Sequence, residues 1–114
     1  LNAMPGQGIY HGRNEKYRFG RQTDIAWDQQ GNIFVSDGYN DARVVKFDKN
    51  GKFLMAWGER GENGKETRPG YFNTVHGIAI DPQTHQVFVN DRANHRVQVF
   101  DEDGKSYIEG VAGM

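Results

Sequence analysis

The chain has 114 residues, of which 36% are hydrophobic and 25% charged, and this length suits one modest domain. Its net charge of −1, with both signs interspersed, argues against a nucleic-acid surface, and no apolar run approaches the ~20 residues that span a bilayer. The absence of cysteine excludes disulfides and thiolate metal sites.

The first 22 residues carry no periodic pattern of apolar side chains. Residues 1–3 precede Met4 and resemble a tag remnant, so we expect the natural chain to begin at Met4. Residues 4–22 are polar and glycine-rich, which predicts an N-terminal arm. No basic segment followed by an apolar one is visible, and with the lack of cysteine this favours a cytoplasmic protein.

From residue 23 onward the same pattern of strands occurs twice, and the second copy lies 53 to 54 residues after the first. Short runs of Ile, Val and Phe between Asp, Asn and Gly predict strands in each copy, and we expect essentially no helix. Asp48 and Asp101 each begin a turn that ends in glycine, which predicts hairpins between the third and fourth strands. The expected strands are 24–28, 32–37, 43–48 and 52–57, then 77–81, 86–91, 96–101 and 106–109.

A unit of this length with four short strands is typical of a propeller blade. We therefore predict an all-β chain of two four-stranded antiparallel blades, with blade 1 and its following loop at 23–70 and blade 2 at 71–114. Trp27 and Trp57 are expected to pack between blades. Two blades cannot close a ring and would leave apolar faces bare, so we expect a homotrimer with six blades.

Asp37 and Asp91 each precede an arginine, Arg43 and Arg96, at the same place in both copies. Because both copies hold the pair, we interpret it as a structural feature of the repeat, in which buried charges tie the strand ends together.

Three side chains depart from the repeat at one end of the predicted strands. His76 precedes an innermost strand where the first copy has Thr23, and it is either a metal ligand or an ordinary hydrogen-bonded histidine. Tyr39 and Arg92 follow the two repeated aspartates, and each is either a functional group or a surface turn residue. The other histidines are expected to be solvated.

The triplets at 37–39 (Asp-Gly-Tyr) and 75–77 (Val-His-Gly), together with Asp91-Arg92, resemble the NHL-repeat propellers and, among them, the peptidyl-α-hydroxyglycine amidating lyases. The resemblance implies six blades around a channel and a zinc ion held by histidines placed like His76. It also implies a base at Tyr39 and a substrate-binding arginine at Arg92. A second essential arginine and two further zinc histidines of such proteins belong to blades outside this chain.

The resemblance leaves two classes of function. The first is a metal-dependent lyase-like site on the channel axis that splits a peptidyl-hydroxyglycine into an amide and glyoxylate, with zinc as the expected metal and calcium as an alternative structural ion. The second is a non-catalytic NHL propeller module that binds protein or peptide ligands. Both predict a small peptide-like ligand and self-association, with neither nucleic acid nor membrane as partner.

Overall fold

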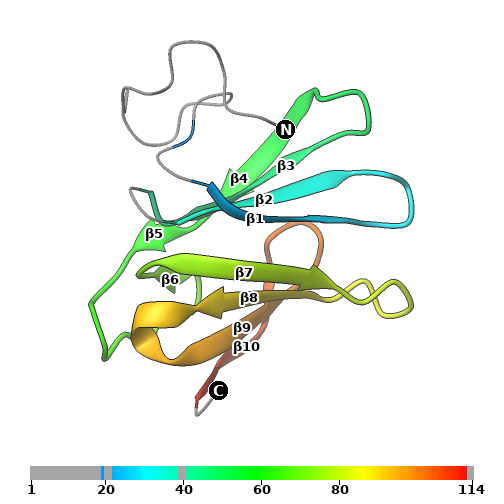
Figure 1. Cartoon of the computed structure of the whole chain (residues 1–114). Coiled ribbons are helices and arrows are strands. Elements are labelled where there is room, and N and C mark those ends of the chain that lie inside the picture. The colour runs from blue at the N-terminus through cyan, green and yellow to red at the C-terminus, as the bar shows by residue number, and fades with distance from the viewer. Residues whose placement is uncertain (1–18, 20–21, 39–40, 113–114) are drawn as a thin grey trace.

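A computed structural model of the chain describes residues 19, 22–38 and 41–112. Two antiparallel sheets of four strands face each other, as Figure 1 shows, which confirms the predicted all-β class and is consistent with propeller blades. In blade 1 the strands follow chain order: β1 (Gln22–Trp27), β2 (Ile33–Asp37), β3 (Arg43–Phe47) and β4 (Phe53–Trp57). Blade 2 repeats that order with β7 (Val75–Ile80), β8 (Val87–Asp91), β9 (Arg96–Phe100) and β10 (Ser106–Ala112).

The aspartate-glycine hairpins form as predicted. Asp48 Oδ1 accepts hydrogen bonds from the backbone N–H groups of Asn50 and Lys52, and Gly51 adopts a φ of 86°. Asp101 and Gly104 repeat this arrangement in blade 2, where the φ of Gly104 is 82°. Each turn is therefore closed by an acceptor at its start and by a residue without a Cβ at its left-handed position.

The segment that links the blades is more ordered than its composition predicts. β5 (Glu59–Arg60) pairs in parallel with β6 (Tyr71–Phe72), and the repeat pattern predicts neither of these two short strands. Glu66 anchors the segment between them, because its buried carboxylate accepts hydrogen bonds from the backbone N–H of Glu62 and from both the backbone and the guanidinium of Arg68. The Arg68 guanidinium, followed by the Glu62 N–H, holds the pKa of Glu66 well below its usual range.

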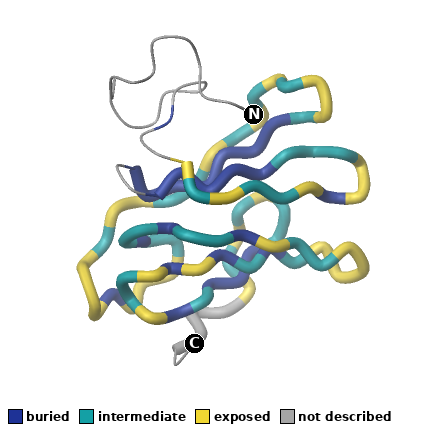
Figure 2. Tube along the Cα trace, viewed as in Figure 1, coloured by how far each residue is buried: buried dark blue, intermediate teal, exposed yellow. Residues whose placement is uncertain are grey.

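The main core lies between the two blades, and Figure 2 shows its buried strand segments. Trp57 of β4 packs between Phe34 of its own blade and Phe100 of blade 2, with ring centroids 6.3 and 5.6 Å away. The expected packing role is therefore confirmed for Trp57. Trp27, the last residue of β1, is 58% exposed in the single chain, and its packing role stays a prediction.

A smaller core covers the other face of blade 1, where we had expected bare apolar surface. Phe19, from the segment predicted to be a polar arm, is buried there and contacts Phe47 edge-on at 6.2 Å between ring centroids. Val35 and Val45 complete this core. Within the described ranges no helix has the length and apolar character needed to cross a membrane.

Candidate functional site

The innermost strands of both blades begin with the same irregularity. In β1 the pairing with β2 shifts between Gln22 and Asp24, and in β7 the pairing with β8 shifts between Val75 and Gly77. The residue at the shift is Thr23 in blade 1 and His76 in blade 2. The predicted equivalence of these two positions is thus present in the fold, as a β-bulge of the kind that redirects a side chain at a strand end.

Around this bulge the two innermost strands meet through side chains. The Thr23 hydroxyl donates to the Val75 carbonyl oxygen at 2.7 Å, directly before His76. Asp24 Oδ2 accepts the N–H of Ile78 at 3.2 Å, and its Oδ1 accepts the N–H of Ile25. Asp24 Oδ2 therefore links β1 to β7 of the other blade, whereas Oδ1 accepts an N–H of its own strand.

His76 is half-buried and makes contacts of its own. Among the described residues no group of three or more His, Cys, Asp or Glu side chains is placed to hold a metal ion. A catalytic zinc takes about three protein ligands. The described part of one chain therefore does not fit a zinc ion by itself, and the metal role of His76 stays a prediction.

Arg92 begins a short 3₁₀ turn, η1 (Arg92–Asn94), which the strand pattern did not predict. The N–H of Arg92 donates to Thr74 at 3.0 Å, and the N–H of Ala93 donates to Asn73 at 3.1 Å. The turn is therefore fastened to the residues that precede β7. Two residues at this junction, Thr74 and His95, adopt a positive φ, which marks it as a constrained corner of the backbone.

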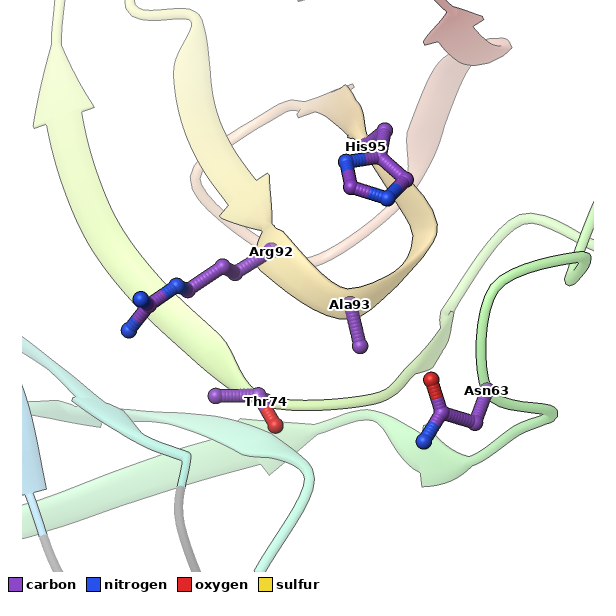
Figure 3. A pocket seen from close by; sticks show the side chains of 5 residues that line it. All are labelled: Asn63, Thr74, Arg92, Ala93 and His95. Atoms are coloured by element: carbon purple, nitrogen blue, oxygen red, sulfur yellow. The ribbon is translucent and has the colours of Figure 1, made fainter.

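An open cavity of about 560 Å³ lies against this turn. Figure 3 shows the exposed Arg92 side chain extending from the turn toward β7, while His95 lies on the other side of the turn. The cavity is lined by Asn63, Thr74, Arg92, Ala93 and His95. Arg92 was singled out from the sequence, whereas the other four belong to turns or to the linking loop and carry no distinctive pattern.

Two of the three predicted site residues lie at the same end of blade 2. Val75 pairs with Asp91, so His76 lies one residue inside β7 and Arg92 one residue beyond β8 at the same end of blade 2. Tyr39 lies outside the described residues. The residue before it, Gly38, packs so closely against Val75 that a Cβ built on Gly38 would lie 1.7 Å from the Val75 carbonyl oxygen.

The repeated Asp–Arg pairs are buried ion pairs, as the sequence predicted. Arg43 Nε lies 3.0 Å from Asp37 Oδ2, and Arg96 Nε lies 2.9 Å from Asp91 Oδ2. Arg96 also donates to the carbonyl oxygens of Arg68 and Tyr71, so the pair in blade 2 fastens the linking segment to the sheet. His85 and His95 are exposed, as expected, and His11 lies outside the described residues.

Comparison with known proteins confirms the resemblance. The NHL repeat family matches residues 72–100. The chain is 37% identical over 107 residues, 93% of its length, to the peptidylglycine alpha-amidating monooxygenase of Rattus norvegicus. It is 34% identical over 95 residues, 83% of its length, to the probable peptidyl-alpha-hydroxyglycine alpha-amidating lyase of Caenorhabditis elegans. It is also 36% identical over 93 residues, 80% of its length, to NHL repeat-containing protein 3 of Mus musculus.

These relatives are much longer than the matched segment. The chain spans 11% of the rat protein, 26% of the nematode protein and 25% of the mouse protein.

Proposed function

We propose, for a chain that carries an NHL repeat and is homologous to amidating lyases over most of its length, that its two blades contribute to a site cleaving peptidyl-α-hydroxyglycine into an amide and glyoxylate. The observation that carries this proposal is the Arg92 cavity, which opens at the same end of blade 2 as the His76 bulge. In the proposed site Arg92 binds substrate, Tyr39 is the base and His76 is a metal ligand.

The reaction requires the protein to bind the substrate and to transfer protons. A guanidinium suits a carboxylate because it offers two parallel N–H donors, so Arg92 is assigned to the substrate carboxylate. Tyr39 takes the proton of the substrate hydroxyl as the carbon–nitrogen bond breaks, and a proton returns to the departing amide nitrogen. A tyrosine with an ordinary pKa of ~10 needs a neighbouring cation for this role, and we assign that part to the guanidinium of Arg92.

We further propose that three chains complete a six-bladed ring. Phe34 and Val44 of blade 1 face blade 2 and pack against the side of it that holds Val87 and Val89. The residues equivalent to Phe34 and Val44 in blade 2 are Phe88 and Val97, which are half-buried and alternate along their strands with residues facing blade 1.

Blade 1 carries a surface that is complementary to the face of blade 2 that holds Phe88 and Val97. Ile33 and Val35 are equivalent to Val87 and Val89, and they lie on the face of blade 1 that turns away from blade 2. The Phe88 face of one chain thus matches the Val35 face of another, which makes a head-to-tail contact. Such contacts form a closed ring when the rotation from each chain to the next divides a full turn evenly. Phe19 occupies part of that face in the single chain.

Metal content tests the metal and assembly parts of this proposal. We expect a particle of three chains with about one zinc ion, because a catalytic site needs about three protein ligands and each chain offers His76. The His76→Ala variant should contain no zinc and should keep the molecular mass of three chains. The His85→Ala variant, which changes an exposed histidine elsewhere, should keep both the zinc and the mass. Light scattering with metal analysis decides: a folded monomer contradicts the trimer, and a metal-free trimer contradicts the zinc site.

Glyoxylate release from a hydroxyglycine peptide tests the chemistry. Arg92→Ala should lower kcat/KM by about ten- to hundredfold, as expected for losing a charged hydrogen-bond partner. The kcat/KM of Arg92→Lys should lie between the values of the wild-type chain and of Arg92→Ala. Lys65→Ala, on the exposed linking loop, is the control and should stay near the wild-type rate. No glyoxylate at high protein concentration would reject the lyase.

A non-catalytic module that binds peptide is the second candidate. It is favoured by the 36% identity to NHL repeat-containing protein 3, whose name specifies no reaction. Peptide binding by a metal-free assembly, without turnover, would support this function over the first.

A further inference from the structure

The two blades of one chain meet through charged side chains at the end where β1 and β7 terminate. Lys46 of blade 1 donates from Nζ to the Glu102 carbonyl oxygen of blade 2 at 2.9 Å and lies 3.6 Å from Asp103 Oδ1. Burial, and then a hydrogen bond with Asp28, the residue after β1, raises the pKa of the Glu102 side chain. Blade 1 therefore contacts blade 2 here at the hairpin turn between β9 and β10.

The repeat gives the contacting residues equivalents in the other blade. Asp81 follows β7 as Asp28 follows β1, and each begins a turn by accepting a backbone N–H on Oδ1. Lys49 and Glu102 are the second residues of the two matching hairpin turns. The turn position that carries an acid in blade 2 thus carries a cation in blade 1.

We propose that Asp81 of one chain forms an ion pair with Lys49 of the next chain. The inference rests on the ring of three chains proposed above, in which blade 2 of one chain packs on blade 1 of the next. That packing repeats, between chains, the contact that blade 1 makes with blade 2 inside one chain. Asp81 then takes the place of Asp28, and Lys49 takes the place of Glu102.

Both side chains suit an ion pair. Lys49 is exposed, and its Cβ lies beside the β1–β2 turn, where a Cβ added to Gly31 would be 3.2 Å away from it. Asp81 accepts the N–H of Gln83 at 2.9 Å, and this bond holds the pKa of Asp81 below its usual range. At neutral pH a carboxylate therefore meets an ammonium group, and the two attract each other.

A second pair of positions changes in parallel between the two kinds of contact. Inside the chain, Lys46 of blade 1 lies close to Asp103 of blade 2. The equivalent positions at the contact between chains are Val99 of blade 2 and Asn50 of blade 1, and neither is charged. The cation and its anion are thus replaced together, which leaves Asp81 and Lys49 as the charges that correspond to the contact inside the chain.

These charges also favour one orientation of neighbouring chains. A head-to-tail contact brings Asp81 of blade 2 to Lys49 of blade 1. A symmetric contact between two copies of the same face would instead bring two lysines or two aspartates to one interface, where like charges repel. The charge pattern therefore fits a second copy of this chain that is added head to tail.

Charge reversal tests the pair by light scattering over a dilution series at low salt. Lys49→Glu places two carboxylates at each contact, and Asp81→Lys places two cations there. An exposed ion pair changes an equilibrium by about fivefold at most, three contacts form together, and dissociation of a trimer scales with the square of concentration. Each single variant should therefore half-dissociate at a concentration about tenfold higher than the wild-type chain, and the variant with both changes should return close to the wild-type value.

Lys105→Glu is the matched control. Lys105 is exposed and directly follows the hairpin turn that contacts blade 1 of its own chain, so this variant changes the net charge as Lys49→Glu does. Its dissociation should stay at the wild-type concentration.

Cysteine cross-linking gives a direct readout, because the chain has no cysteine of its own. On oxidation, a chain with both Lys49→Cys and Asp81→Cys should form disulfides between neighbours and reach the mass of three chains in a denaturing gel. A chain with Lys49→Cys alone should stay at the mass of one chain.

The proposal is overturned if the wild-type ring forms and Lys49→Glu dissociates no more readily than Lys105→Glu. It is equally overturned if the variant with both reversals is as weak as the single ones. Either result removes the ion pair and leaves the ring and the proposed function standing. A wild-type chain that stays monomeric refutes the ring and the ion pair together.

Discussion

Gly38→Ala is expected to destabilise the chain by about 3 kcal/mol or more, measured as the free energy of unfolding in urea. The added Cβ would lie 1.7 Å from the carbonyl oxygen of Val75 and 2.6 Å from its carbonyl carbon. These are backbone atoms of β7, so relief requires the two blades to separate where their innermost strands begin. Gly38 and Val75 directly precede Tyr39 and His76 in the chain, so the same change should also reduce metal binding and activity.

Gly77→Ala is the matched control, because it adds the same methyl group one position beyond His76. Its Cβ would lie 3.7 Å from the nearest atom, an ordinary van der Waals distance. We expect a change within about 0.5 kcal/mol. Equal losses for the two variants would show that the contact between Gly38 and Val75 does not hold the blades together.

Arg96→Met is expected to cost about 3–5 kcal/mol, because it leaves the fully buried carboxylate of Asp91 without its cation. The change also removes the donors to the carbonyl oxygens of Arg68 and Tyr71 and so releases the linking segment from blade 2. The measurement is again the free energy of unfolding in urea.

Lys65→Met is the control for this second change. Lys65 pairs with Glu62 at 3.5 Å in the open, with 76% and 57% of the two side chains exposed. A surface pair of this kind contributes at most about 1 kcal/mol. A loss for Arg96→Met no larger than for Lys65→Met would contradict the role of the buried pair as the fastening between the sheet and the linking segment.

The sequence predicted most of the fold because the two copies support each other. Each of the eight predicted strands is present, and the equivalence of Thr23 and His76 reappears as the same bulge. What the pattern missed lies outside the repeat. β5 and β6 have two residues each, too few for any period, and they depend on Glu66, which is one acidic residue among several in a charged loop.

The candidate site was only partly predictable for a similar reason. Arg92 stood out because it departs from the repeat, and it lines the cavity. Asn63 and Thr74 reach the same cavity through the linking segment and the corner before β7, which only the assembled backbone brings together.

The contacts between β1 and β7 also bear on the geometry of any larger assembly. If main-chain ladders joined these strands, the two sheets would merge into one continuous surface. Thr23 and Asp24 join them instead through short side chains, which hold the strands apart at a defined opening. The placement of one sheet against the other therefore depends, at this end, on the reach of a hydroxyl and of a carboxylate, together with the core that packs between the sheets.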